Sequence, residues 1–445
     1  MDNIKIWQEL EGMIEEGQSG LRVGCNDYRT FNNMSLYVKA LMSSVERKNS
    51  WQLAEMVGAK TPYNFQYLLC YAAIDVVALK KALIKITIEN LGTQGYLTFD
   101  DTGFLKKGDQ SSGVQRQYTG TAGRVENCQI GTFMGYKTQK GHNLLDGKLY
   151  LPESWLNDPQ RCRKAGIPEG LKFEKKALQA AGMYKSFKEQ GYECSWVTAD
   201  EAYGKDPDFV KVLEEYNQPY ILAVPKDYSI RCGDLKQRFE ALKCAESADV
   251  NLWEMHSAGK GSKGERVYEW LLIKRNEINS FSEFEKFLLI RRSMSTGELA
   301  FYSVMAPKNR SLQELAMAAG SRWSIEECFE MAKGETGLDQ YEVRSYRGWE
   351  RHTTFSMWAL MILVNLKNKV SDPANLANKL LENNKKPEIL VADLDKEQAS
   401  ELVLASGAIT TQELSAGQEQ LDSMHEYKKK QKILSALRFK KLDVL

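Results

Sequence analysis

The chain has 445 residues and a formal net charge of +1, so its length allows about three domains, while its balanced charge excludes an argument for nucleic-acid binding from overall basicity. Its eight cysteines form no Cys-x2-Cys pair, which argues against a zinc site or a disulfide framework. No apolar run approaches the roughly 20 residues of a membrane span and no Walker-type phosphate loop is present, so we expect a cytoplasmic protein without a membrane segment or a nucleotide cofactor.

Residues 1–93 are predicted to form an all-α amino-terminal domain, because apolar residues recur there three and four positions apart. Gly58 is expected to end one helix and Pro62 to open the next, which is the spacing of a helix-turn-helix that binds DNA. An ordinary helical hairpin explains the same pattern equally well. In the DNA-binding interpretation, four residues contact bases or phosphates: Asn64, Gln66, Arg47 and Lys48.

A short strand at Tyr96–Phe99 is predicted to deliver Asp100 to its own end, with Asp101 beside it. A buried acid is poorly solvated, so it needs a salt bridge, a turn or a metal ion. Taken alone the pair is ordinary, because Asp is common at strand ends and in turns. Lys106 and Lys107 follow in a loop that we expect beside these acids, where the lysines could hold a phosphate.

Residues 94–224 are predicted to form the first part of an α/β core. Two antiparallel strands meet at a turn at Lys140–Gly141, and after a helical segment a parallel strand at Trp196–Ala199 ends in Asp200. A further helix and a strand at Tyr220–Val224 complete the pattern. We therefore expect a mixed five-stranded sheet flanked by helices.

Residues 225–309 have a different sequence pattern from the preceding core. Short apolar strands separated by turns are predicted there, which indicates a β-rich insertion. Trp253 and Trp270 could stack on a flipped base there, but a place in the core of the insertion is favoured. Basic residues gather in this region and are expected to contact DNA in preference to forming only a solvated face: Lys260, Lys263, Arg266, Lys274, Arg275, Arg291 and Arg292.

Residues 310–370 are predicted to form the second part of the core, beginning with an amphipathic helix. Arg322, Glu326 and Lys333 share one face of this helix. Without other signals, Arg322 and Glu326 would be an ordinary i,i+4 ion pair worth a few tenths of a kcal/mol. Residues 371–445 are expected to be helical with a basic end that suits nucleic acid or a partner protein.

The strings DDTGFLKKG and WVTADEAYG, taken together with this helix, resemble the DDE transposases of bacterial insertion sequences over Tyr96–Trp358. Those enzymes carry Tyr-x2-Arg-x3-Glu-x6-Lys on a signature helix, and the arginine, glutamate and lysine of this chain stand at those spacings. The tyrosine position is Ala319. Either another residue such as Tyr341 replaces that tyrosine, or binding of the DNA ends is weaker.

The resemblance implies an RNase H-like catalytic core in which Asp100, Asp200 and Glu326 are the catalytic residues and metal ligands, while Arg322 and Lys333 bind phosphates. Converging carboxylates repel each other unless a cation is present, and oxygen ligands without His or Cys select Mg²⁺ or Mn²⁺. Two such ions can activate the attacking oxygen and stabilise the leaving oxygen of a phosphodiester.

The function implied by the resemblance is that of a transposase, which binds the terminal inverted repeats of its own element, cleaves the DNA backbone and joins the ends to target DNA. Such enzymes work as homodimers or larger assemblies. Two alternatives stay open at this point. One is an RNase H-like metal-dependent nuclease without strand transfer, and the other is a DNA-binding protein whose catalytic site has been repurposed.

Overall fold

The computed structural model describes residues 12–231, 238–261, 264–275 and 283–370. The carboxy-terminal region predicted for residues 371–445, and Lys263, lie outside these ranges. Within the described ranges no helix is long and apolar enough to cross a membrane. The chain divides into two compact units: the first takes Met1–Ile86, Met331–Val343 and Arg351–Leu445, and the second takes Thr87–Glu330 and Arg344–Glu350.

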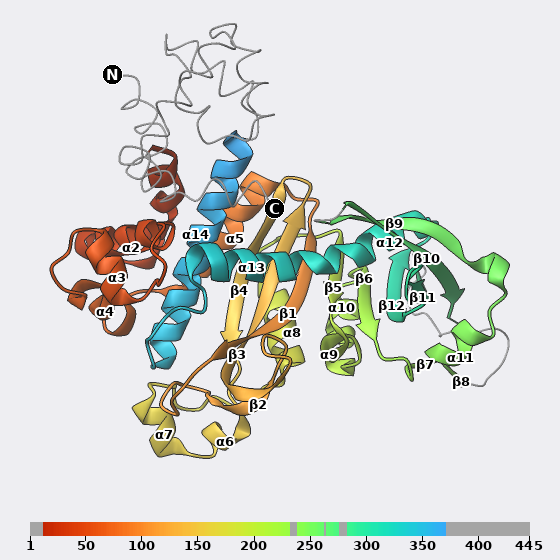
Figure 1. Cartoon of the computed structure of the whole chain (residues 1–445), viewed down its shortest axis with the longest axis horizontal. Coiled ribbons are helices and arrows are strands. Elements are labelled where there is room, and N and C mark those ends of the chain that lie inside the picture. Colours follow the sequence, from red (N-terminus) through yellow and green to blue (C-terminus); the bar gives the residue numbers. More distant parts are fainter. Residues whose placement is uncertain (1–11, 232–237, 262–263, 276–282, 371–445) are drawn as a thin grey trace, which may run out of the picture. The chain divides into compact units, whose positions relative to one another are not determined.

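The described part of the first unit is helical, as predicted for residues 1–93 (Figure 1). One buried arginine links two of its segments, since the Arg351 guanidinium donates to the carbonyl oxygens of Leu68 and Ala72 at 2.8 and 2.5 Å. The elements lying wholly in this unit are η1 (Gly20–Gly24), α2 (Tyr28–Leu41), α3 (Ser50–Met56) and α4 (Tyr63–Cys70). Three helices contribute residues to both units: α5 (Val76–Leu91), α13 (Ser324–Thr336) and α14 (Tyr346–Val370).

The helical hairpin predicted around Gly58 is confirmed by α3 and α4. Asn49 begins α3, because its side-chain oxygen accepts the backbone N–H groups of Trp51 and Gln52. Gly58 follows the end of α3 with φ of 75°, a conformation that glycine adopts without the penalty of a Cβ atom. Helix α2 packs against both helices, so the three form one small helical cluster.

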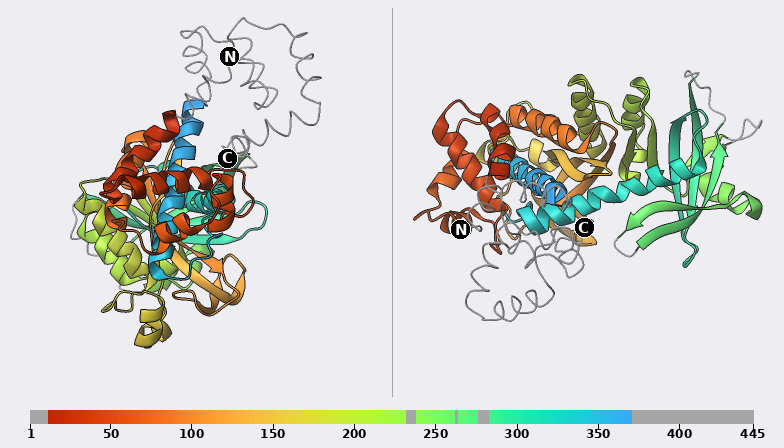
Figure 2. Two further views of the ribbon diagram at one scale, coloured as in Figure 1. Left: turned by 90° about the vertical axis from the view of Figure 1, so that its left-hand side faces the viewer. Right: turned by 90° about the horizontal axis from the view of Figure 1, so that it is seen from above.

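The second unit is built on one mixed sheet (Figures 1 and 2). In the described residues its strands run in the order β2-β3-β1-β5-β6-β12-β11-β10-β9, and β4 also pairs with β3. The strands are β1 (Tyr96–Leu105), β2 (Gln115–Thr119), β3 (Arg124–Thr138), β4 (Gly141–Leu149), β5 (Trp196–Ala199), β6 (Tyr220–Val224), β9 (Glu254–Gly261), β10 (Gly264–Lys274), β11 (Phe284–Arg292) and β12 (Leu299–Pro307). A separate hairpin pairs β7 (Ser229–Arg231) with β8 (Arg238–Glu240).

The predicted five strands are present in the order β4-β3-β1-β5-β6, with β1 parallel to β5 and β5 parallel to β6. The prediction of five strands is wrong in extent, because β6 is not an edge. It pairs antiparallel with β12, from Tyr220 opposite Met305 to Val224 opposite Phe301, and the strands of the insertion continue the same sheet. This pairing satisfies backbone groups that a free edge would leave open.

Helices pack on opposite faces of the core strands. Thr132 of β3 donates to Gln179 of α8 on one face, while Phe133 meets Phe329 of α13 on the other, with ring centroids 5.5 Å apart. This follows from the strand period of two residues. The remaining helices are α6 (Glu153–Leu156), α7 (Pro159–Lys164), α8 (Lys176–Glu189), α9 (Glu201–Gly204), α10 (Pro207–Glu215), α11 (Ala241–Glu246), η2 (Val250–Leu252), α12 (Leu312–Gly320) and η3 (Ser321–Trp323).

Replacing Gly320 with Ala is expected to destabilise the second unit, because a Cβ atom at this position would lie 1.9 Å from the carbonyl oxygen of Ala258 on β9. Overpacking of this kind typically costs about 1–3 kcal/mol, so the midpoint of thermal unfolding should fall by several degrees. Gly334→Ala is the control, since its Cβ would meet no atom within 4 Å. Equal midpoints for the Gly320 variant and the unaltered chain would contradict this packing.

Candidate active site

Asp100 and Asp200 come directly after the last residues that pair the parallel strands β1 and β5. The last pair between β1 and β5 is Phe99 with Ala199, and each acid comes directly after its strand partner. The prediction that the first strand ends at its acids is wrong, because β1 continues to Leu105. The long strand β3 pairs with β1 through this whole stretch, so Asp100 stands where only the parallel neighbour has ended.

The second acid of each pair has a different partner. Lys176 of α8 donates to Asp101 at 2.9 Å, on the opposite face of the sheet from Asp100. Glu201 lies 3.5 Å from Lys205 one helical turn later. The first members of the two pairs are therefore the candidates for chemistry, as the sequence implied.

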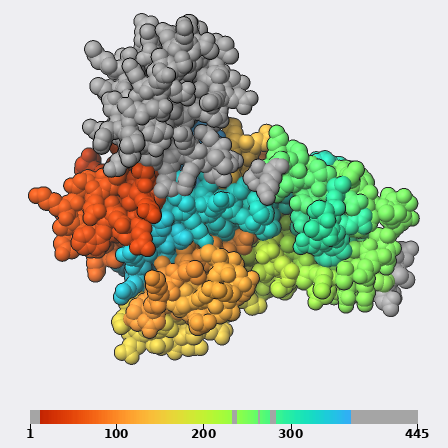
Figure 3. All heavy atoms as spheres, viewed as in Figure 1, coloured from red at the N-terminus to blue at the C-terminus, as the bar shows by residue number. Residues whose placement is uncertain are grey.

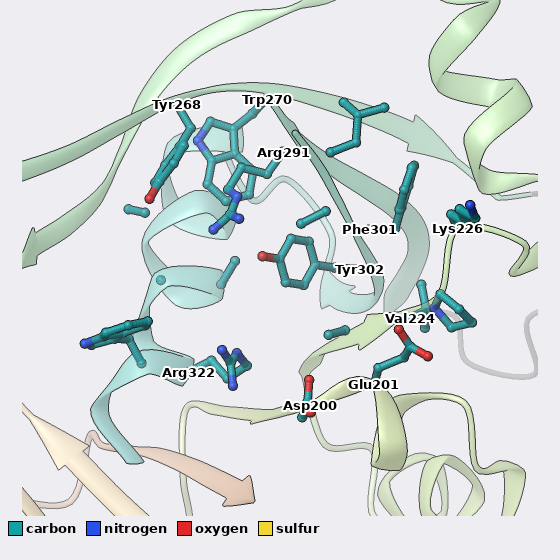
Figure 4. Close-up of a pocket in the computed structure, with 18 of the residues that line it drawn as sticks. Asp200, Glu201, Val224, Lys226, Tyr268, Trp270, Arg291, Phe301, Tyr302 and Arg322 are labelled. Carbon is teal, nitrogen blue, oxygen red and sulfur yellow. The ribbon is translucent and has the colours of Figure 1, made fainter. Parts of the chain in front are cut away.

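Arg322 connects the third acid to this pair. Its guanidinium Nη2 donates to Glu326 Oε1 at 2.7 Å, and its Nη1 lies 3.7 Å from Asp100 Oδ2. Arg322 and Asp200 face each other across the mouth of a cavity (Figure 4). One cation thus links the glutamate of α13 to the acid on β1, and the predicted residues Asp100, Asp200, Arg322 and Glu326 meet in one place.

Helix α13 is fixed against the sheet by the residues that flank Glu326. Ile325 packs over Gly135, where an added Cβ would lie 3.4 Å from the isoleucine side chain. Glu327 Oε2 lies 3.8 Å from His142 Nδ1 of β4, and burial raises the pKa of this glutamate. These contacts hold Glu326 on the same face of the sheet as Asp100.

The charge distribution makes Asp100 the unusual acid. Burial, followed by repulsion from Asp101 and Asp200, raises the pKa of Asp100 to about 7, although the Arg322 guanidinium lowers it in part. Burial lowers the pKa of Arg322, but Glu326, Asp100 and Asp200 outweigh that effect and raise it overall. The negative charge of Asp100, Asp200 and Glu326 therefore exceeds the positive charge of Arg322.

The donor chemistry of these residues fits a hard divalent cation. Asp100 and Asp200 offer only carboxylate oxygens, which are the ligands that Mg²⁺ and Mn²⁺ prefer. Their mutual repulsion would fall when a cation binds. Across the described residues, however, no three His, Cys, Asp or Glu side chains are gathered closely enough to hold a metal, and Arg322 stands between Asp100 and Glu326.

A cavity of about 570 Å³ opens beside Asp200 and Arg322 (Figure 4). Strands of the insertion supply much of its wall through Tyr268, Arg291 and Tyr302. Tyr268 and Tyr302 are not among the site residues predicted from the sequence. Only the pairing of β12 with β6 brings them beside the catalytic strands, and that long-range pairing has no local signal in the sequence.

The two tryptophans of the insertion are core residues, as favoured from the sequence. Trp270 is 1% exposed and donates its ring N–H to the carbonyl oxygen of His256 at 3.1 Å. Trp253 packs against the second buried cluster of the insertion, with the Arg292 guanidinium 4.1 Å from the centre of its ring.

Most of the predicted DNA-contacting cations of the insertion already have partners. Lys274 and Arg292 form ion pairs with glutamates at 2.6 and 2.7 Å. Arg275 is buried and donates to Ser303, while Arg266 donates to the carbonyl oxygens of Ala258 and Gly320. Arg291 lies over the Tyr268 ring, 4.5 Å from its centre, in the wall of the cavity. For Arg291 and Lys260, contact with DNA stays a prediction.

Three predicted phosphate-binding residues lie elsewhere than expected. Lys48 is fully buried, where its ammonium donates to the carbonyl oxygen of Ser43 at 2.5 Å, so its prediction as a surface contact is wrong. Lys106 and Lys107 are not beside the acids. Strand β1 carries the chain past Asp100, and six residues of strand place Lys106 roughly 20 Å away.

The other predicted contacts are compatible with surface roles. Arg47 and Asn64 are exposed, and Gln66 of α4 is half-buried. Lys333 lies in the first unit, where burial lowers its pKa and Asp339 raises it in part. The contacts of these four residues with DNA stay predictions.

Tyr341 does not replace the tyrosine absent at Ala319. It is 4% exposed in the core of the first unit, with its ring centre 5.1 Å from that of His352. Ala319 itself is buried in the second unit and lines the same cavity as Tyr302 and Arg322.

The chain is similar to several known proteins. Residues 23–238 match the family model described as DDE superfamily endonuclease. A probable transposase for insertion sequence element IS701 from Microchaete diplosiphon is 27% identical over 207 residues, which are 46% of this chain and 51% of the relative. The match thus spans about half the length of that curated relative. A piggyBac transposase in a synaptic complex with hairpin DNA aligns with 93% of this chain and 76% of its own, at 11% identity and with a TM-score of 0.39.

Asp100→Asn is expected to stabilise the protein in EDTA at pH 8. Because the pKa of Asp100 is raised to about 7 in the folded state, its ionisation disfavours folding, and this penalty grows as the pH rises from about 4 through 7. The unfolding midpoint of the variant should be higher by roughly 2–8 °C at pH 8, with a smaller gain at pH 5. Glu215→Gln is the control and should leave the midpoint nearly unchanged at both pH values, since this exposed acid lies 4.0 Å from Lys211 at the surface. An equal gain at both pH values would contradict the assignment.

Proposed function

We propose that this chain, which belongs to the DDE superfamily, is the transposase of an insertion sequence: it binds the ends of its own element, cleaves the DNA backbone and joins the ends to target DNA. The observation that carries this proposal is the matching position of Asp100 and Asp200 after paired parallel strands, with Glu326 linked to them through Arg322. The strand order β4-β3-β1-β5-β6 supports an RNase H-like core.

Asp100, Asp200 and Glu326 would hold the divalent cations on which DDE endonucleases generally depend, two Mg²⁺ or Mn²⁺ ions in our proposal. When bound, such ions lower the pKa of an attacking water or DNA 3′-hydroxyl and stabilise charge on the leaving oxygen. Because the attacking oxygen would come from water or DNA, no covalent protein intermediate is needed.

Arg322 has a second role in this proposal. Its guanidinium is held now by two carboxylates, Asp100 and Glu326. A planar guanidinium also matches the geometry of a phosphate, so Arg322 is positioned to exchange a carboxylate for the phosphate beside the cleaved bond. Lys333 is assigned to the flanking DNA strand.

DNA recognition is assigned to the helices of the first unit. The exposed residues Arg47 and Asn64, with Gln66, suit phosphate and base contacts by α4 and the turn before α3. Action on two DNA ends requires two active sites, so a homodimer or larger assembly on DNA completes the proposal.

A nuclease without strand transfer, or a DNA-binding protein with a repurposed site, would share the same fold. The first differs in failing to join pre-cut ends to a target plasmid. The second differs in making no metal-dependent cut. Cleavage of a linear duplex carrying the element end, followed by a joining assay with pre-cut ends, separates the three.

Asp100→Asn should reduce cleavage of element-end DNA in Mg²⁺ at least 100-fold, because it removes a charged ligand at the reacting phosphate. Glu215→Gln is the matched control, since this exposed acid pairs only with Lys211 at 4.0 Å and should leave cleavage within about twofold. Both variants should bind the duplex as the unaltered chain does. Undiminished cleavage by the Asp100 variant would refute the site.

Tyr302→Phe should weaken binding of the cleaved end about 3- to 10-fold, the usual effect of losing one hydrogen bond. Tyr302 lines the cavity with Ala319 and Arg322, so we assign to its hydroxyl the contact made in related transposases by the tyrosine absent here. Tyr192→Phe, outside the cavity, is the control. Fluorescence anisotropy with a labelled end duplex measures the effect, and equal affinity for the two variants would exclude this role.

A further inference from the structure

We infer that a basic surface at the far end of β1 binds duplex DNA at a distance from the cleaved phosphate. The inference rests on the proposed function and adds a second DNA-binding surface within the second unit. We call it the end surface and define it by six exposed residues: Lys107, Arg116, Arg163, Lys164, Arg344 and Arg347.

Three segments distant in the sequence form the end surface (Figures 1 and 3). The backbone N–H of Ser112 donates to the carbonyl oxygen of Arg344 at 2.9 Å, and that of Tyr346 donates to Ala165 at 2.9 Å. The Arg161 guanidinium donates to the carbonyl oxygen of Asp109 at 3.0 Å. The loop after β1, helix α7 and the segment before α14 therefore form one continuous surface.

This surface is basic although the whole chain is nearly neutral. Residues 106–119, 153–165 and 344–350 contain eight lysines and arginines against four acids, while the full chain has a formal charge of +1. One of the four acids, Asp158, is used as the cap of α7, where it accepts the N–H of Arg161. The positive charge is thus concentrated, as in surfaces that contact the DNA backbone.

A further arginine, Arg161, lies beside these six residues and is held in position. Its guanidinium is 3.7 Å from the centre of the Trp155 ring, and the buried Trp155 donates to the carbonyl oxygen of Val114 at 2.8 Å. The neighbouring hollow of about 300 Å³ is lined by Gln110, Gln160, Arg161 and Lys164, and also by Asp109 and Asp158. Because two carboxylates line this hollow, we assign the phosphate contacts to the exposed cations around it.

The insertion offers a contrast, since its cations Lys274 and Arg292 are held in ion pairs with Glu285 and Glu269. Freeing them for phosphates would break those pairs. Within the part of the chain that the structure describes, the six exposed cations of the end surface form no ion pair that would have to be broken, which favours them for backbone contact.

The distance from the active site defines which DNA would be bound. Lys106 lies roughly 20 Å from Asp100 along β1, and a duplex rises about 3.4 Å per base pair. A duplex that begins at the site and follows the strand would reach the end surface about six base pairs from the cleaved phosphate. The contact would hold any sequence, because phosphates carry no base information.

The test compares two triple variants by fluorescence anisotropy on a labelled end duplex of about 30 base pairs. Arg116→Ala/Arg163→Ala/Lys164→Ala should weaken binding about 10- to 100-fold and reduce the slope of log affinity against log salt by about 2 to 3. The control Lys205→Ala/Lys211→Ala/Lys243→Ala removes the same charge from exposed lysines elsewhere in the unit and should bind within about threefold. Matching thermal midpoints establish that both variants fold.

A second duplex tests where the contact lies. It ends about three base pairs from the cleavage position and so lacks the DNA that the end surface would bind. The end-surface variant should bind it as well as the unaltered chain does, because the DNA that it contacts is missing. Should the triple variant fail to fold, Arg344→Gln alone, with an expected loss of about fivefold on the long duplex only, takes its place.

The outcomes separate this inference from the function on which it rests. Equal weakening by both triple variants, or unchanged binding by the end-surface variant, overturns the end surface while metal-dependent cleavage by the unaltered chain upholds the proposed function. If the unaltered chain neither binds nor cuts the duplex, both are overturned.

Discussion

The arrangement of the active site depends on how Arg322 balances three acids. Asp100, Asp200 and Glu326 come from two strands and a helix, and like charges at such a meeting point resist approach. The Arg322 guanidinium contacts Glu326 directly and Asp100 at longer range, so α13 can lie against the strand ends with its charges partly compensated. The raised pKa of Asp100 indicates that compensation is incomplete, which leaves the site receptive to cations.

The surrounding fold serves to keep this meeting point in place. Ile325 and Glu327 anchor α13 on the sheet on either side of Glu326. On the opposite face, Lys176 pairs with Asp101 at 2.9 Å and offsets part of its charge, although Asp101 still raises the pKa of Asp100. Tyr302 comes to the cavity from the insertion, which therefore forms part of the wall of the candidate active site.

Local patterns indicated acids after short apolar strands and a helical i,i+4 pair, but only the resemblance to a known family selected Asp100, Asp200 and Glu326 as one set. Structural features that depend on contacts between residues far apart in the sequence could not be predicted from local patterns. Strand β1 continues past its acids only because β3 is long enough to pair with it. Lys48, which reads as a surface cation, is buried because tertiary packing brings Gln340 and Ser43 around it.

The pairing of β6 with β12 has a consequence for how such a chain can change over time. Because the inserted strands extend the main sheet, deleting them would leave β6 as an unpaired edge strand. A shortened chain would then tend to aggregate through the unpaired backbone groups of β6. Loops between the outer strands can vary freely in length, but β12 is constrained by its two neighbours, β6 and β11. The inserted strands are therefore as necessary to the folded sheet as the core strands on either side of them.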